Sequence, residues 1–286
     1  MQLAIKRLCI FSTLGLFCVM VSACAAQGAA ESSPALPQVT LPNSEVRTLK
    51  SDNTGRTYDI YIRVPEEYSE ARSYPVLYVL DGQWDFKLLD SIYGGLHYDQ
   101  FVPEIIIVSV TYSGDNPNYD ALRAIDYTPP VEPPIPGYGE ADKFLAFIKE
   151  ELFPLIESNY HTDPSHRMLM GSSFGGLFTL YALFTEPELF SGYVSASPAV
   201  PYGNGVIFKQ EAEYAEERQD LPAKLYLSVG EIEPLARPVE AFIEVMSKRN
   251  YQGLKMETQI IAGERHAGNK PEAFNRGLRF LFQDEN

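Results

Sequence analysis

The sequence predicts one α/β domain with a mostly parallel central sheet and helices on both faces. Strand and helix patterns alternate from residue 45 onward, as they do in doubly wound folds. Two apolar runs without polar alternation, at 74–80 and 104–112, are typical of parallel strands buried on both faces. The hydrophobic content of 45% can supply a large core. We therefore expect a single domain over residues 44–286.

The other elements follow from local patterns. Two strands, 45–50 and 57–64, flank the turn residues 52–55 and are expected to pair antiparallel. Further strands are expected at 168–170, 192–196, 224–229 and 254–261, and helices near 144–155, 174–184, 239–248 and 272–282. The stretch 113–140 carries six prolines and little periodicity. It is expected to be a long loop, either a lid or specificity loop over the functional edge of the sheet or a disordered insertion.

The first 23 residues are expected to be a signal peptide. Lys6 and Arg7 precede an apolar run, 8–20, that is too short to span a bilayer. The next residues, Val-Ser-Ala-Cys, resemble a bacterial lipobox, which predicts a lipid on Cys24; ordinary cleavage at Ala23-Cys24-Ala25 is the alternative. Residues 24–43 are rich in Ala, Ser and Pro and are expected to form a flexible tether. The expected location is therefore the periplasm or cell envelope of a bacterium, with membrane attachment through this lipid.

Charge and cysteine content exclude several kinds of chemistry. The net charge of −15 disfavours nucleic acids and anionic membrane surfaces as partners. All three cysteines lie at or before Cys24, so the predicted domain has no disulfide and no cysteine chemistry. His161 and His166 lie in a predicted turn with no third ligand type beside them. No metal and no organic cofactor is expected.

Residues 171–175, Gly-Ser-Ser-Phe-Gly, fit the nucleophile-elbow pattern G-x-S-x-G. Only Ser173 has glycine two residues before and two residues after it. A predicted strand leads in and a predicted helix leads out, which is the context that this strained turn requires. The pattern predicts Ser173 as a catalytic nucleophile.

The base and the acid are expected further along the chain, because this motif takes its partners in the order Ser, Asp or Glu, His. Of the four histidines only His266 follows the elbow, in a polar, glycine-flanked loop. Between the two, Asp220 is the single aspartate and precedes Leu-Pro. Glu231 and Glu233 follow a predicted strand, where a carboxylate can hold a histidine. Glu233 has the better spacing to reach His266, and Glu231 is the alternative acid.

Two further parts of the site are expected near the elbow. The backbone amide of Phe174, the residue after the nucleophile, should form one half of an oxyanion hole, and an amide from the loop after the strand 74–80 should form the other. Gln83 in that loop is the candidate second donor. Trp84, the single tryptophan, either walls the substrate pocket or packs in the core.

Several segments resemble the putative-esterase (esterase D-like) family of α/β-hydrolases, most closely in the style of its siderophore-esterase branch. They include YPVLYVLDG, ALRAIDYTPP and HRMLMGSSFGGLFTLYALFTEPELFSGYVSASP, and the resemblance extends over residues 45–282. It implies an α/β-hydrolase fold with Ser173 as nucleophile and His266 as base. It also implies that Arg123 and Asp126 shape the region near the site, with Arg123 as a substrate-binding residue.

The expected function is an exported serine carboxylic-ester hydrolase that acts on a small-molecule ester through an acyl-enzyme. A siderophore-type ester is the candidate substrate. Because a ferric catecholate is anionic and the chain is acidic, such a substrate would need a local basic patch. An acyltransferase, or a feruloyl or acetyl carbohydrate esterase with the same triad, is the alternative.

Overall fold

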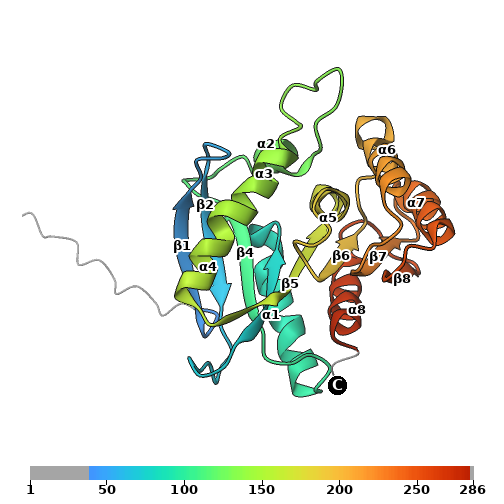
Figure 1. Cartoon of the computed structure of the whole chain (residues 1–286). Coiled ribbons are helices and arrows are strands. Elements are labelled where there is room, and N and C mark those ends of the chain that lie inside the picture. Colours follow the sequence, from blue (N-terminus) through green and yellow to red (C-terminus); the bar gives the residue numbers. More distant parts are fainter. Residues whose placement is uncertain (1–38, 284–286) are drawn as a thin grey trace, which may run out of the picture. The chain divides into compact units, whose positions relative to one another are not determined.

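The computed structural model describes residues 39–283, and within them the chain from residue 41 onward forms one compact unit. That unit contains an eight-stranded sheet in the order β1-β2-β4-β3-β5-β6-β7-β8 (Figure 1). The predicted signal peptide, Cys24 and most of the predicted tether lie outside the described residues. The strands are β1 (Ser44–Lys50), β2 (Thr57–Arg63), β3 (Tyr74–Val79), β4 (Ile106–Tyr112), β5 (Thr162–Ser172), β6 (Gly192–Ala196), β7 (Lys224–Gly230) and β8 (Lys255–Ile261).

The sheet is mostly parallel, as expected. β1 pairs antiparallel with β2, and β2 pairs antiparallel with β4. Every other neighbouring pair, from β4–β3 to β7–β8, is parallel. The carboxyl ends of six strands therefore meet at one edge, where open α/β sheets place their ligands.

Helices cover both faces of the sheet, and the sheet separates the core into two clusters. They are α1 (Gly82–Tyr98), α2 (Tyr119–Tyr127), α3 (Ala141–Phe147), a π-helical turn η1 (Ile148–Leu152), α4 (Phe153–Asn159), α5 (Phe174–Thr185), α6 (Tyr202–Glu217), α7 (Ala236–Arg249) and α8 (Lys270–Phe282). α1 and α8 pack against each other and against one cluster. The helices from α2 to α7 surround the other. The predicted α/β architecture is confirmed.

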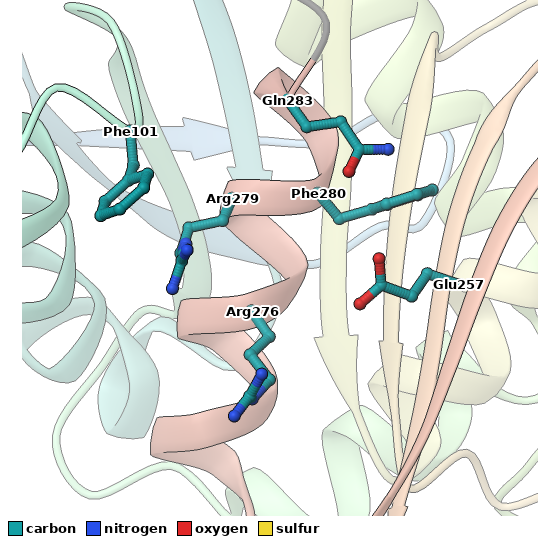
Figure 2. Close-up of a pocket in the computed structure, with 6 residues that line it drawn as sticks. All are labelled: Phe101, Glu257, Arg276, Arg279, Phe280 and Gln283. Carbon is teal, nitrogen blue, oxygen red and sulfur yellow. The ribbon is translucent and has the colours of Figure 1, made fainter.

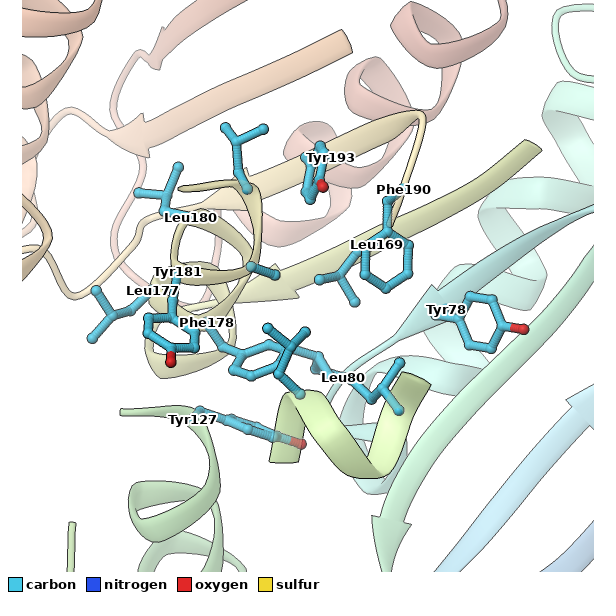
Figure 3. Close-up of a cluster of buried hydrophobic side chains, with 14 of the residues drawn as sticks. Tyr78, Leu80, Tyr127, Leu169, Leu177, Phe178, Leu180, Tyr181, Phe190 and Tyr193 are labelled. Carbon is cyan, nitrogen blue, oxygen red and sulfur yellow. The ribbon is translucent and has the colours of Figure 1, made fainter. Parts of the chain in front are cut away.

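The helix that follows the elbow is buried along almost its whole length. Leu177, Phe178 and Leu180 of α5 pack toward Leu169 of β5 and Tyr127 of α2 (Figure 3). Fully burying one such side chain is worth about 1.5–3 kcal/mol. α5 also contacts α2 and α6, so the start of this helix is fixed from several sides.

Three helices and one strand differ from the sequence-based expectation. α1 begins at Gly82, within the segment expected to be a loop, and Gly94 and Gly95 inside it weaken the helical pattern. α2 is short and lies within the proline-rich stretch, and its buried face includes the polar residues Arg123 and Asp126, which an apolar pattern does not mark. α6 was also missed.

β5 begins six residues before the expected start, at Thr162. His166 therefore lies in a strand rather than in a turn. The early part of β5 is polar and half-exposed, which explains why an apolar run marked only its end.

Candidate active site

Ser173 occupies a sharp turn between β5, which ends at Ser172, and α5, which begins at Phe174. Its backbone has φ 61° and ψ −119°, a strained combination for a residue with a side chain. The amide of Ser173 donates to the carbonyl of Ala196 at 3.0 Å. A Cβ added at Gly171 would lie 2.5 Å from the carbonyl carbon of Gly175. The glycine before the nucleophile is thus required by close backbone approach.

A buried carboxylate meets the predicted base. Glu233, in the loop after β7, is 6% exposed, and its Oε2 is hydrogen-bonded to Nδ1 of His266. The other oxygen, Oε1, accepts hydrogen bonds from the Gly230 amide at 2.7 Å, the Ser197 hydroxyl at 2.5 Å and the Asn269 amide at 3.1 Å. The carboxylate is therefore held on both oxygens and oriented toward His266.

Glu231 has a different environment. Its side chain is exposed, and its Oε2 accepts a hydrogen bond from the amide of Gly263 at 2.7 Å. This contact ties two neighbouring loops together. It does not involve the imidazole.

The turn at Ser173 is connected to the Glu233–His266 pair through residues 196 and 197. Ala196, whose carbonyl holds Ser173, is followed by Ser197, whose hydroxyl reaches Glu233. In the described part of the chain, no hydrogen bond joins Ser173 to His266 directly. Hydrogen bonds of this kind are often long without substrate and tighten in the complex.

Two backbone amides are available beside the nucleophile. Phe174 is the first residue of α5 and Gln83 the second residue of α1, so neither amide has a carbonyl partner within its helix. β3 and β5 are neighbours in the sheet, and a Cβ added at Gly175 would lie 3.3 Å from Asp81 Oδ2. The two helices therefore start close together. Gln83 lies in a helix and not in the expected loop, and its side chain accepts a hydrogen bond from Thr111 at 2.7 Å.

Arg123 is buried and has protein partners. Its guanidinium donates to both carboxylate oxygens of Asp81, at 2.8 and 2.7 Å, and to the carbonyl of Ser172 at 3.2 Å. It also lies over the rings of Trp84 and Phe174, 5.7 and 5.5 Å from their centroids. Burial lowers the pKa of Arg123, but the charge of Asp81 and its hydrogen bonds, together with the neighbouring tyrosines Tyr127 and Tyr112, outweigh burial and raise the pKa. The contacts of Arg123 thus position the elbow and the start of α1.

Asp126 lies on the same helix but serves another junction. It is fully buried, pairs with Arg56 and accepts a hydrogen bond from the Tyr58 hydroxyl at 2.9 Å. Burial raises the pKa of Asp126 to about 6, although Arg56 opposes this shift. Arg56 also pairs with Glu140 at 2.8 Å. This cluster anchors the base of the proline-rich stretch to the sheet.

The loop between α2 and α3 returns over the elbow. Its two ends meet at Thr128, which accepts hydrogen bonds from the amides of Gly139 at 2.8 Å and Ala141 at 3.1 Å. The ring of Tyr138 lies 6.1 Å from that of Phe174 and stacks at 5.8 Å on a tyrosine at the start of α6. This placement favours the lid or specificity-loop interpretation.

Exposed apolar side chains surround the carboxyl edge of the sheet. Trp84 is 41%, Tyr138 39% and Ile232 47% exposed. The exposure of Trp84 contradicts the alternative of core packing. A groove of about 550 Å³ runs beside this rim between the loop and the start of α6, and is lined by Pro130, Val131, Glu132, Gly203, Asn204, Gly205, Val206 and Lys209.

A different pocket lies along α8 (Figure 2). It has a volume of about 380 Å³ and is lined by Phe101, Glu257, Arg276, Arg279, Phe280 and Gln283. None of the predicted site residues lines it. Within residues 39–283, no group of three His, Cys, Asp or Glu side chains could hold a metal ion. None of the helices in this range has the length and apolarity needed to cross a membrane.

Three site residues were missed by the sequence analysis: Asp81, Ser197 and Asn269. Each follows the carboxyl end of a strand or lies in the loop that carries the histidine. Their position could have identified them, because α/β sheets build their ligand sites from polar residues at this edge. Their partners are far apart in sequence, so their contacts could not be read from spacing.

Comparison with known proteins gives the family. Residues 51–269 match the model of the family described as "Putative esterase". The chain belongs to this family. It is 31% identical over 269 residues to the ferri-bacillibactin esterase BesA of Bacillus subtilis, an alignment that covers 86% of this chain and 92% of BesA.

Solved structures of similar proteins have the same fold as this chain. The BES protein from Bacillus cereus superposes with a TM-score of 0.79 at 30% identity, covering 87% of this chain and 98% of that one. An IroE-like serine hydrolase from Shewanella oneidensis gives 0.76 at 26% identity, covering 85% and 81%. The fold is an α/β-hydrolase fold of the siderophore-esterase-like branch, and the protein is a carboxylic ester hydrolase.

Proposed function

We propose that the protein is an exported esterase that hydrolyses siderophore-type esters with Ser173, His266 and Glu233 as its catalytic triad. The main support for this triad is the hydrogen bond between the buried Glu233 carboxylate and Nδ1 of His266. The strained turn at Ser173 supplies the nucleophile. The substrate class is supported by the relative BesA, whose name gives ferri-bacillibactin as its ester. The exposed apolar rim and the adjacent groove offer room for a bulky ester.

The proposed reaction proceeds through an acyl-enzyme. Because Nδ1 of His266 is held by Glu233, Nε2 is the nitrogen left to take the proton of Ser173 as its Oγ attacks the ester carbonyl. The amides of Phe174 and Gln83 then stabilise the oxyanion, each by about 3–4 kcal/mol. His266 returns the proton to the leaving alcohol as the ester C–O bond breaks. A water molecule, deprotonated by the same histidine, releases the acid.

Ser173→Ala tests the nucleophile. The purified variant should remain folded by circular dichroism while hydrolysis of p-nitrophenyl butyrate falls to the background rate. A fluorophosphonate probe should label the wild type and not the variant. Retained activity or labelling would contradict the assignment.

A panel of esters tests the substrate class. It should compare a catecholate trilactone, with and without iron, with feruloyl esters, acetylated sugars and p-nitrophenyl butyrate, and include an acceptor alcohol. We expect the highest kcat/KM for the trilactone. A preference for the sugar or feruloyl esters, or accumulation of a transfer product, would instead favour the carbohydrate esterase or the acyltransferase.

Export rests on the N-terminal sequence. Lys6, Arg7, the apolar run 8–20 and Cys24 support a lipidated envelope protein. In cell fractionation, the wild type should enter the membrane fraction and Cys24→Ala should not. A cytosolic wild type would refute the proposal.

A further inference from the structure

We infer that Asn269 and Ser197 are positioning residues for the reaction: they hold the Glu233 carboxylate toward His266 and fix the loop that carries His266. The inference rests on the proposed roles of Glu233 and His266. It adds two buried side chains to that pair.

The orientation of Asn269 is unusual for its place in the fold. It immediately precedes α8, a position where asparagine commonly caps a helix with its side-chain oxygen, yet it makes no side-chain capping hydrogen bond. Its Oδ1 is buried and has no partner among the described residues. A side chain placed to stabilise the helix would use this oxygen. The geometry instead favours the contacts of its nitrogen.

The nitrogen of Asn269 faces four acceptors. It lies 2.8 Å from the Ser197 hydroxyl, 3.1 Å from Glu233 Oε1, 3.1 Å from the carbonyl of Arg265 and 2.9 Å from the carbonyl of His266. The Ser197 hydroxyl gives its own proton to Glu233, so toward Asn269 it can only accept. Rotating the amide would place Oδ1 against these oxygens. A donor is therefore required at this position.

Ser197 connects the acid to the elbow. It is fully buried, has φ 44°, and directly follows Ala196, whose carbonyl holds the amide of Ser173. Its hydroxyl donates to Glu233 Oε1 at 2.5 Å. The strained backbone turns this hydroxyl toward the acid, and strain of this kind clusters at functional sites.

Three separate loops meet at Asn269: the end of β6, the loop after β7 with the acid, and the loop after β8 with the base. The loops after β7 and β8 are joined by backbone hydrogen bonds from the Glu231 amide to the Ile261 carbonyl and from the Ile232 amide to the Glu264 carbonyl, both at 3.0 Å, but these bonds do not hold the Glu233 carboxylate itself. A misplacement of about 1 Å can cost on the order of 100-fold in rate. The side chain of Asn269 adds a link between the carboxylate of the acid and the backbone carbonyl of the base.

Two substitutions of Asn269 distinguish the loss of its hydrogen-bond donor from the loss of its side-chain volume. Asn269→Asp keeps the shape but sets a carboxylate against Glu233, whereas Asn269→Ala removes the group. We expect both to lower kcat for p-nitrophenyl butyrate by about 10–100-fold with KM little changed. Asn269→Asp should lower kcat at least as much as Asn269→Ala. Asn275→Asp, the same change on a half-exposed residue of α8, is the matched control and should keep kcat. Wild-type kcat in Asn269→Asp, or an equal loss in Asn275→Asp, would overturn the inference.

A spectroscopic readout makes the test independent of turnover. A hydrogen-bonded imidazole Nδ1–H gives a far-downfield proton NMR signal, which His266→Gln should remove. In the Ser173→Ala background we expect this signal to weaken or vanish with Asn269→Ala and to persist with Asn275→Asp. If Asn269→Ala leaves the signal unchanged, the positioning role is wrong even if the esterase proposal is right. If the protein lacks esterase activity but the signal responds, the proposed function fails and the positioning contact stands.

Ser197→Ala covers the case in which the Asn269 variants do not fold. It removes one donor to Glu233 while leaving the amide of Ser197, which donates to Ser228 at 2.7 Å. We expect kcat to fall about tenfold with unchanged KM, and the NMR signal to weaken. Wild-type kcat together with an unchanged signal would overturn the inference.

Discussion

Arg123 and Asp81 form a buried bidentate ion pair behind the nucleophile elbow. The same guanidinium donates to the carbonyl of Ser172, so one cation joins the residue before Ser173 to the residue before α1. Asp81 itself has φ 58°, which turns the chain sharply from β3 into the helix. The spacing between the two proposed oxyanion donors therefore depends on this pair.

Arg123→Lys should lower kcat by about 100-fold with little change in KM, because a lysine is a point charge that cannot replace the planar, bidentate contact. Arg167→Lys is a matched control: Arg167 also makes two hydrogen bonds to one carboxylate, that of Glu157, but lies in the middle of β5, away from the elbow. The control should keep kcat. Steady-state kinetics and thermal melts of both variants check this, and equal kcat values would contradict it.

The two glutamates after β7 should differ sharply. Glu233→Gln removes the charge that holds His266, and we expect kcat to fall by about 10³–10⁴-fold. Glu231→Gln changes an exposed side chain whose contact is with the amide of Gly263, and kcat should stay within a few-fold of wild type. If Glu231→Gln gives the larger loss, the acid has been misassigned.

Local sequence rules predicted the parts of the site that depend on backbone geometry. The glycine frame singled out Ser173, and its strained φ/ψ and the close approach of Gly171 to Gly175 are what that frame requires. The spacing of Glu233 from Gly230, at the end of the strand, favoured Glu233 over Glu231, and Glu233 is the glutamate that bonds to His266. Order along the chain is informative here because the sheet fixes which loops meet.

Tertiary contacts determined what the sequence could not show. Asp81 and Arg123 are 42 residues apart, and Ser197 and Asn269 are 72 apart. No rule of sequence spacing predicts a contact between the members of either pair. α2 was missed because two of its four buried residues are the charged Arg123 and Asp126, and its nine residues lie among prolines that indicate a loop.

The need for glycine at position 171 of the elbow can be tested by comparison with a glycine that has no close neighbours. Gly171→Ala would place its methyl group 2.5 Å from backbone atoms of Gly175, so the elbow must shift, and we expect lost activity and a lower melting temperature. Gly94 lies within α1 with no atom near its added Cβ. Gly94→Ala should stabilise the protein by about 0.5–1 kcal/mol and keep activity. Equal melting temperatures for the two variants would argue against backbone crowding at the elbow.

Arg265 directly precedes His266 in the chain, and its positively charged side chain is exposed. It forms no ion pair with any described residue. If the substrate is an anionic ferric catecholate, Arg265→Gln should raise KM several-fold for that ester, and more at low salt than at high salt. KM for neutral p-nitrophenyl butyrate should not change. Arg218→Gln, at the far end of α6, is the control, and an equal effect on both esters would exclude a specific role for Arg265.

Asp85 should make stability depend on pH through its contact with α8. It is 2% exposed and pairs with Lys270 at 2.8 Å. Burial raises the pKa of Asp85 from 3.8 to about 6, although Lys270 opposes the shift. Between these two values the folded chain binds a proton that the unfolded chain releases. The resulting stabilisation is full below pH 3.8 and is lost as the pH rises through 6.

Asp85→Asn cannot titrate, so it isolates this effect from that of the other carboxylates. The free energy of unfolding of the wild type, relative to that of Asp85→Asn, should be about 1 kcal/mol larger at pH 5 than at pH 7, so the wild type is relatively more stable at pH 5. Urea unfolding of both proteins at the two pH values measures the difference. A difference that is equal at both pH values, or larger at pH 7, would show that the Lys270 charge dominates over burial and that Asp85 is ionised throughout this range.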